Sequence, residues 1–359
     1  MGVTNFRNPD FRHKYTTFVT NRRISSQKNN NSPLLFANKG FQLLTLHSEN
    51  KTTHMKRIKP LNDYETATIA LTNYCKGRDL TYNELAVVIT HINHILSTHG
   101  VSKNDRVAIT NEETEAWAIK LAAIVTYGAV AVIVPNQASN TDKEYINNVS
   151  APVMSLDGYD SLEQLLNTPT RRPVRINIMQ FSLDDDIIID FRRDRCGQLH
   201  AVTTKVYEFM QLAETIKTRY SSLRHSRIPL MLLANQNSVD AKEVLAALSI
   251  GAHIAMAGSQ PSSGTLLKCL KHYRPHFVCL DTSTAERLIR ERVLPMLHNP
   301  NTPSHMMSSI ARRNLMKQAR KRMMFALGGC ILMVSVTGGR FSPDIETFLQ
   351  RIDFPYQII

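Results

Sequence analysis

The sequence predicts an α/β fold in which layered parallel sheets are flanked by helices. From about residue 60 onward, short apolar runs of strand length alternate with longer segments whose apolar residues recur at helical spacing. Strands that are separated by helices are typical of parallel βαβ units. Apolar residues make up 43% of the 359 residues and charged residues 20%, which is the composition of a globular chain that buries a sizeable core.

The individual elements follow from the spacing of the apolar residues. Residues 81–100 carry one apolar stripe at helical spacing, and Gly100 is suited to end that helix. An apolar run at 187–190 leads into a polar loop, after which a helix begins at Val206. The other expected strands are 105–110, 129–135, 229–233, 252–257, 276–280 and 331–336. The other expected helices are 114–128, 238–249, 264–273, 284–297 and 305–327.

The amino-terminal segment, residues 1–57, differs from the rest of the chain. It is basic and of low complexity, and we expect it to be disordered. Residues 1–59 hold 11 Lys and Arg against 2 acidic residues, out of a net charge of +13. The folded part is therefore close to neutral, which argues against a nucleic-acid partner. A transit peptide shares this composition; we favour an upstream extension of the reading frame, with Met55 as the alternative start to Met1.

The cysteines and the hydropathy indicate a reducing compartment. The five cysteines are scattered and have no CxxC spacing, so we expect free thiols and neither a disulfide framework nor a zinc site. No apolar run approaches the length of a transmembrane helix. We expect a cytoplasmic protein that can lie peripherally at the inner face of the membrane. His91 and His94 are expected to be solvated, and Trp117, the only tryptophan, to lie in the core.

One stretch of the chain carries a family resemblance. The segment "DLTYNELA…GVSKNDRVAITNEETEAWAIKLAAIVTYGAVAVIVP" (79–135) is similar to the opening of adenylate-forming (AMP-binding) acyl-activating enzymes. Residues 245–256, 266–297 and 336–359 resemble later stretches of the bacterial type of long-chain fatty acid–CoA ligases. The resemblance implies that residues 58–359 form an incomplete large domain of the acyl-CoA synthetase fold, without the small carboxy-terminal domain.

The resemblance also implies a reaction. Members of this family are acid–thiol ligases that convert ATP and a fatty acid into an acyl-adenylate and pyrophosphate, and then transfer the acyl group to coenzyme A. Such chemistry needs a Gly/Ser/Thr loop with a lysine to neutralise the pyrophosphate. It also needs Mg²⁺ with an acidic ligand. ATP, Mg²⁺ and coenzyme A are the cofactors expected if the family activity is retained.

The family's phosphate loop falls on residues 191–202 of this chain. The aromatic start and the closing valine remain, but the hydroxyls and the lysine do not, and His200 occupies the place of the lysine. The arginines of this loop could attract phosphate, whereas Asp194 opposes them. We therefore expect that the loop has lost ATP binding. The degenerate nucleotide-binding positions are Arg192, Arg193, Asp194, Arg195, Gly197 and His200.

The acyl and adenine side of the family's site is also altered. Gln236 stands where the family has a histidine, whereas the turn Thr337, Gly338 and Gly339 retains the family's glycines. This turn lines the acyl and adenine pocket in the family, but a tight strand-to-helix turn before Pro343 explains it equally well. The sequence ends at Ile359, where the family's next motif would begin. We assign no catalytic residue and no metal ligand.

Three functional hypotheses follow. The first is a truncated, catalytically inactive relative of the ligases, with no bound cofactor. The second is a non-catalytic protein that binds an acyl group or regulates an intact ligase. The third is an active enzyme completed by a downstream reading frame. Self-association through exposed sheet edges near the terminal "FPYQII" is expected with the first.

A membrane surface is a further candidate partner. The cations of residues 312–322 could rest on an anionic bilayer, although a charged, solvated face over a methionine-lined core contact is the interpretation that the sequence favours. These cations are Arg312, Arg313, Lys317, Arg320, Lys321 and Arg322.

Overall fold

The computed structural model describes most of the chain beyond residue 67. The described residues are 43–44, 58–59, 68–110, 115–157, 181–193, 196–221, 228–234, 240–258, 260–297 and 309–359. They all belong to the compact unit Gly40–Ile359. A short antiparallel pair, β1 (Leu43–Leu44) with β2 (Ile58–Lys59), precedes the main body. The rest of the expected disordered segment 1–57 lies outside the described residues, so that expectation and the domain boundary remain predictions.

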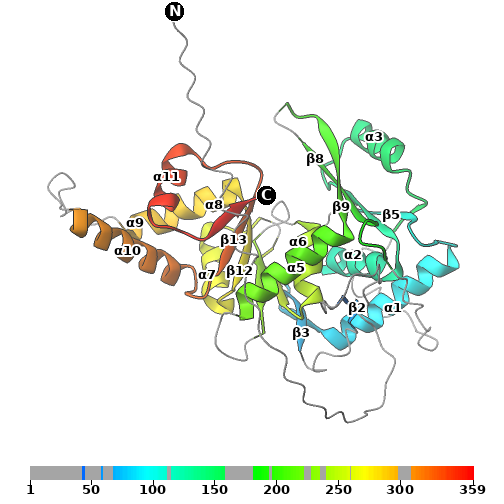
Figure 1. Ribbon diagram of the computed structural model, residues 1–359, viewed down its shortest axis with the longest axis horizontal. Helices are drawn as coiled ribbons and strands as arrows, with labels where there is room; N and C mark the ends of the chain where they lie inside the picture. The colour runs from blue at the N-terminus through cyan, green and yellow to red at the C-terminus, as the bar shows by residue number, and fades with distance from the viewer. Residues whose placement is uncertain are drawn as a thin grey trace, which may run out of the picture. The chain divides into compact units, whose positions relative to one another are not determined.

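A seven-stranded sheet forms one half of the body (Figure 1). Its strands are parallel except for the pairing between the edge strand β4 and its neighbour β3, which is antiparallel. In order across the sheet the strands are β14 (Tyr356–Ile358), β13 (Met333–Thr337), β12 (Phe277–Asp281), β10 (Leu230–Leu233), β11 (His253–Met256), β3 (Ile69–Asn73) and β4 (Arg78–Thr81).

A five-stranded sheet forms the other half. Here too the pairings are parallel apart from the last one, between β8 and β9. The order is β7 (Met154–Ser155), β5 (Arg106–Thr110), β6 (Val130–Val134), β8 (Asp186–Arg193) and β9 (Leu199–Lys205). The expected α/β fold with layered parallel sheets and flanking helices is therefore confirmed.

The helices pack in layers against the two sheets. One core lies between the sheets and is filled by α1, α2, α5 and α6, while α7, α8, α10 and α11 cover the other face of the larger sheet, and α3 that of the smaller one. The helices are α1 (Tyr82–Thr98), α2 (Glu115–Tyr127), α3 (Asn140–Ser150), α5 (Val206–Ser221), α6 (Ala241–Ser249), α7 (Ser263–Tyr273), α8 (Thr282–Leu288), a π-helical turn (Ile289–Val293), α9 (Leu294–Leu297), α10 (Ser309–Ala326) and α11 (Pro343–Arg351). Among the described residues, no helix is both long and apolar enough to cross a bilayer.

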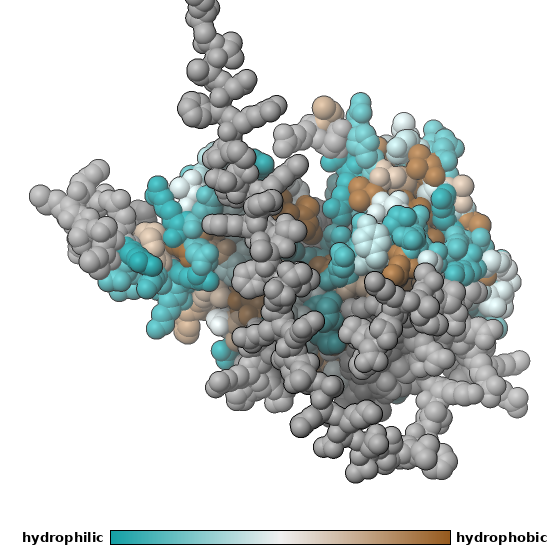
Figure 2. Space-filling model, in the orientation of Figure 1, coloured by the Kyte–Doolittle hydropathy of each residue, from teal (hydrophilic) through white to brown (hydrophobic). Residues whose placement is uncertain are grey.

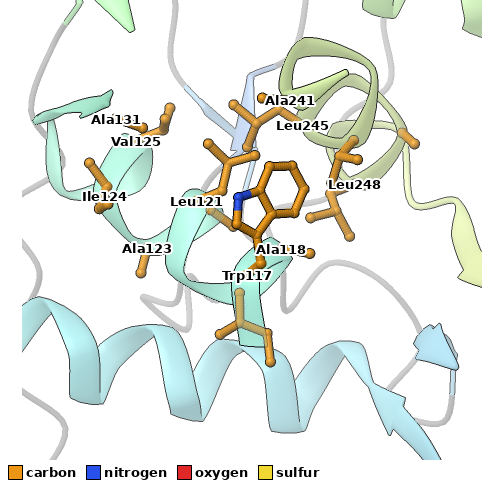
Figure 3. Close-up of a cluster of buried hydrophobic side chains, with 14 of the residues drawn as sticks. Trp117, Ala118, Leu121, Ala123, Ile124, Val125, Ala131, Ala241, Leu245 and Leu248 are labelled. Atoms are coloured by element: carbon orange, nitrogen blue, oxygen red, sulfur yellow. The ribbon is translucent and has the colours of Figure 1, made fainter. Parts of the chain in front are cut away.

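The central core between the sheets includes Trp117. Its side chain is only 2% exposed, and it lies among Leu121 of its own helix and Leu245 and Leu248 of α6 (Figure 3). The expectation that Trp117 is a core residue is confirmed. Helix α6 is buried along nearly its whole length, which explains why its apolar residues run "VLAAL" without a polar face.

Helix α1 shows how local sequence sets an element. Thr81 caps its amino terminus in a capping box: the backbone N–H of Glu84 donates to Thr81 Oγ1, and Glu84 Oε2 accepts from the Thr81 backbone N–H at 2.8 Å. Leu85 and Ile89 are fully buried.

The expectation of a solvated His91 is wrong, since its side chain is buried. This burial, followed by the charge of His94, lowers the pKa of His91.

Several elements were not foreseen from the sequence. Strands β3, β4 and β9 and helix α3 fall where no element was expected. Strand β9 is mostly exposed, and α3 has only two buried residues, so neither carries the apolar spacing that identifies a buried element. Strand β9 pairs with the smaller sheet and α3 covers it, and this tertiary context determines their structure, whereas β3 and β4 pair with each other at the edge of the larger sheet.

The packing of α1 generates a stability prediction. Replacing Leu85, which is fully buried, by Ala should lower the free energy of unfolding by about 2–5 kcal/mol, because the lost contacts leave a cavity. The matched control is Val87→Ala on the same helix, where the side chain is 48% exposed and the change should stay below about 0.5 kcal/mol. Denaturant unfolding followed by circular dichroism measures both, and equal effects would contradict the packing described here.

Candidate functional site

The predicted phosphate loop is the tip of a β-hairpin. Strand β8 extends to Arg193 and pairs antiparallel with β9, so that Arg192 lies opposite His200. Gly197 lies in the connecting turn with a positive φ of 80°, a conformation that favours glycine. The expectation of a polar loop from the end of the 187–190 strand to Val206 is corrected, since β9 fills most of it with the β-branched run at 202–204. Asp194 and Arg195 lie outside the described residues.

Arg192 is held by two carboxylates. Its Nε donates to Asp190 Oδ2 at 3.0 Å and its Nη2 donates to Asp240 Oδ2, also at 3.0 Å. Asp240 is buried and caps α6, because its Oδ1 accepts from the backbone N–H of Lys242 at 2.9 Å. Burial raises the pKa of Asp190 although Arg192 opposes the shift. Burial tends to lower the pKa of Arg192, but Asp240 and Asp190 outweigh it, so that its pKa is raised.

Arg193 is paired as well, with helix α3. Its Nη2 donates to Asp142 Oδ2 at 2.6 Å, and its Nη1 donates to the carbonyl oxygen of Gly197 at 2.8 Å. Asp142 also closes the capping box of α3 with Ser139. Its hydrogen bonds with Ser139, together with Arg193, lower the pKa of this carboxyl. Both described arginines of the hairpin are thus engaged by carboxylates of this chain.

The turn after β13 contains the second group of predicted positions. Thr337 ends the strand, and Gly338 and Gly339 follow with positive φ values of 87° and 110°. Thr282 Oγ1 lies 2.9 Å from the carbonyl oxygens of both Thr337 and Gly339 and donates to them. Helix α11 then begins at Pro343. The residues form the strand-to-helix turn that the sequence allowed. Gln236 lies outside the described residues.

A buried carboxyl that the sequence did not point to lies between these two regions. Glu243 of α6 is 3% exposed and accepts hydrogen bonds from Ser335 Oγ at 2.5 Å and Cys279 Sγ at 3.1 Å. Gln357 Nε2 donates to the same Ser335 Oγ at 3.0 Å. Burial, followed by the nearby charge of Asp240, raises the pKa of Glu243. The only signal in the sequence was one acidic residue at the start of an otherwise apolar helix.

Helix α6 connects the hairpin with the turn after β13. Its amino-terminal cap, Asp240, binds Arg192 of the hairpin, and one turn later Glu243 binds Ser335, two residues before Thr337. Two groups of positions that lie 140 residues apart in the sequence are therefore joined through one helix terminus. The side chains that make this connection, Asp190, Asp240 and Glu243, are acidic. Asp240 follows the rule that acidic residues precede helices, so its position, though not its partner, could be read from the sequence.

The described arginines of the hairpin are not available as the unpaired cations that a triphosphate would need. A triphosphate needs backbone N–H groups, hydroxyls and unpaired cations, but the described arginines of the hairpin are paired. Within the described ranges, no group of three or more His, Cys, Asp and Glu side chains converges to hold a metal ion. The five cysteines are free thiols, with Cys75 and Cys196 exposed.

Part of the chain matches a known protein family. Residues 62–190 match the AMP-binding enzyme family. This match ends at Asp190, before the hairpin turn. No curated protein sequence matches the chain significantly.

Solved structures share the fold. The N-terminal subdomain of NpsA from Klebsiella oxytoca, bound to 3-hydroxyanthranilyl-AMSN, is 18% identical, with a TM-score of 0.57 over 83% of this chain and 69% of that chain. The same NpsA subdomain in space group C2 is 16% identical, with a TM-score of 0.59 over 83% of this chain and 72% of that chain. The o-succinylbenzoate CoA synthetase MenE from Bacillus subtilis, in a double-mutant form, is 13% identical, with a TM-score of 0.59 over 82% of this chain and 56% of that chain. The fold is that of the N-terminal subdomain of adenylate-forming enzymes.

The buried Glu243 generates a prediction on pH. Because its folded-state pKa is raised above the ordinary carboxyl value of 4.5, the folded chain keeps a proton that the unfolded chain loses as the pH rises through that value. This group therefore lowers stability progressively from the unfolded pKa up to the raised folded pKa. Glu243→Gln removes the titration, so the stability of this variant relative to the wild type should rise with pH across that window.

Urea unfolding at a series of pH values measures this difference. The matched control is Glu144→Gln, which replaces an exposed glutamate on α3 and should leave the pH dependence unchanged. Parallel stability curves for the wild type and Glu243→Gln would show that Glu243 is ionised in the folded chain, contrary to the prediction.

Proposed function

We propose that this chain is an AMP-dependent synthetase/ligase-like protein of the long-chain fatty acid–CoA ligase type that does not catalyse acyl activation. The AMP-binding match at residues 62–190 and the adenylation-domain fold support the broad assignment. The segments 245–256, 266–297 and 336–359 support the fatty acid branch, because they resemble that branch in order. The pairing of Arg192 and Arg193 with carboxylates carries the proposal of inactivity.

The electrostatics of the hairpin explain why ATP would not be held there. A phosphate that approaches Arg192 would compete with two carboxylates at 3.0 Å, and displacing them would leave Asp190 and Asp240 without their cation in a mostly buried position. Leaving the buried Asp240 carboxylate unpaired is unfavourable, although the 40% exposure of the Arg192 side chain lets solvent screen part of the interaction. His200, opposite Arg192, has no permanent charge with which to replace the lysine of the family's loop.

The alternative function is acyl binding or regulation of an intact ligase. For acyl binding, the cavity beside β12 and β13 is too small. A cavity of about 20 Å³ is enclosed by α7, α8, α10, α11, β12 and β13, and all its lining atoms are apolar. This is the volume of about one water molecule, too small for an acyl chain. An acyl group could enter this cavity only if the surrounding helices and strands moved apart. The cavity therefore does not favour acyl binding over a regulatory role.

The test of inactivity is a pair of assays on the full chain. ATP–pyrophosphate exchange with palmitate, and formation of palmitoyl-CoA from ATP, palmitate and coenzyme A with Mg²⁺, should both stay at background. An intact ligase assayed in parallel controls for the reagents, and cooperative thermal unfolding controls for folding. Robust turnover in either assay would overturn the proposal.

The pairing of Arg193 gives a prediction on anion affinity. Asp142→Asn removes the negative charge that binds Arg193 but keeps an oxygen for the cap with Ser139, so the affinity for pyrophosphate should rise about three- to fivefold. Glu144→Gln, a neutralised and exposed acid on the same helix, is the matched control and should have a smaller effect. Titration calorimetry measures the affinities for pyrophosphate. An equal rise in affinity for the two variants would mean that the ion pair with Asp142 does not weaken anion binding by Arg193.

A further inference from the structure

Helix α10 presents a basic face that, within the described residues, meets an acidic partner only at Arg320. Its sequence from Ser309 to Ala326 contains no acidic residue. We define the α10 face by its exposed cations and one aromatic residue: Arg313, Lys317, Lys321, Arg322 and Phe325. The side chain of Arg312 is outside the described set.

The cations of the α10 face are free to meet an external anion. Within the described residues Arg320, at the border of the face, pairs with Asp353, whereas Arg313, Lys317, Lys321 and Arg322 make no ion pair. This contrasts with the hairpin, where Arg192 is bound by two carboxylates. A run of cations without local acids raises the positive potential at the surface.

The apolar and polar residues of α10 lie on opposite sides. Met323 and Ala326 are buried and Met316 packs against the core, which confirms the expected methionine-lined core contact. On the other side, Lys317, Lys321 and Phe325 follow one another at four-residue intervals and therefore line up along the helix. Phe325 is 80% exposed, the most exposed large apolar side chain among the described residues.

The basic surface continues onto helix α7. The carboxy-terminal end of α7 meets the turn after α10, where Arg274 Nε donates to the carbonyl oxygen of Gly328 at 3.1 Å. This contact is tight, because a Cβ on Gly328 would lie 2.4 Å from the carbonyl oxygen of Leu270. Lys271 and Arg274 of this region are exposed. Phe325 is thus close in the chain to a junction that carries exposed cations on both helices. Figure 1 shows the end of α10 beside α7, and Figure 2 shows hydrophilic residues along the described part of α10.

We infer that the α10 face docks on an anionic lipid surface, with Phe325 entering the interfacial layer and the lysines and arginines contacting lipid phosphates. An interfacial helix of this kind combines a cationic face with a large apolar residue. Charge complementarity selects the anionic surface, and the exposed Phe325 selects a lipid over a purely ionic partner, because burying a phenylalanine side chain is favourable only where an apolar phase is available. The described cations are too few for the broad basic surface that non-specific nucleic-acid binding needs, since the folded part is close to neutral.

Two features of this binding follow from its physical basis. It is reversible, because a few cations and one aromatic side chain give far less affinity than a spanning helix. It also weakens as salt is added, since the contacts lie at the surface and within the range of screening. The inference does not depend on whether the chain activates fatty acids.

Vesicle co-sedimentation of the full chain tests the inference. The chain should bind vesicles of phosphatidylcholine mixed with phosphatidylglycerol, bind little to phosphatidylcholine alone, and be released by high salt. Lys317→Gln combined with Lys321→Gln should lower the partition coefficient about 30-fold, the effect expected from removing two lysines near an anionic surface. Lys143→Gln combined with Lys217→Gln neutralises two exposed lysines on α3 and α5 and should change it less than about twofold.

This matched pair separates the α10 face from the basic amino-terminal segment. If the chain binds anionic vesicles and both double variants bind equally well, the contact is made elsewhere and the inference is wrong. Failure of the wild type to bind, or equal binding to neutral vesicles, also overturns it. Loss of single-stranded RNA binding in the α10 variant, without any vesicle binding by the wild type, would assign the face to a nucleic acid instead.

A fluorescence experiment tests the insertion of Phe325. Since Trp117 is the only tryptophan and is buried in the core, wild-type emission should not respond to vesicles. In Phe325→Trp the emission should shift to shorter wavelengths on addition of anionic vesicles and should be quenched by brominated lipid. A spectrum that does not change while the protein is bound would show that the side chain stays in water, which contradicts the proposed insertion.

Discussion

The ion pair between Arg192 and Asp240 joins two parts of the structure that the sequence keeps apart. It ties the hairpin of the smaller sheet to the amino terminus of α6, whose buried length fills the core between the sheets. From the same helix, Glu243 reaches Ser335 of the larger sheet. Arg192 is therefore the cation that compensates buried acids at this junction, and breaking such a pair by removing one partner leaves the other charge buried and unpaired.

Acidic side chains outnumber the described arginines around the hairpin. Asp190, Asp240 and Asp142 all lie within hydrogen-bonding distance of the two described arginines, so the arginines are outnumbered by their own partners. Counting three arginines in the sequence suggested a positively charged loop, but the potential at a site depends on which charges remain after internal pairing. Burial raises the pKa of Glu243, which disfavours a further unpaired charge in the core.

Much of the fold could be predicted from the sequence because buried elements repeat their apolar residues regularly. The strands at 105–110 and 129–135 and the helix at 114–128 were foreseen to within two residues for this reason. Strand β9 was missed because it is largely exposed, and with it the hairpin that positions Arg192 opposite His200. The partners of the predicted positions Arg192, Arg193 and Thr337 could not be foreseen, because each comes from a distant segment. These partners are Asp240, Asp142 and Thr282. The spacing of apolar residues indicates which side chains are buried, but it does not indicate which polar side chains contact one another.

Arginine and lysine side chains have different surroundings in the hairpin and in α10. At the hairpin, Arg192 lies beside acids that other elements contribute, and its charge is used within the fold. On α10 the sequence supplies cations and no acids for eighteen residues, and within the described part of the chain only Arg320 finds a partner, on the loop after α11. A cation that remains unpaired in the folded chain can only be compensated by solvent ions or by another surface. Arg192 and Arg193 are thus paired within the fold, whereas Arg313, Lys317, Lys321 and Arg322 of α10 make no ion pair within the described residues.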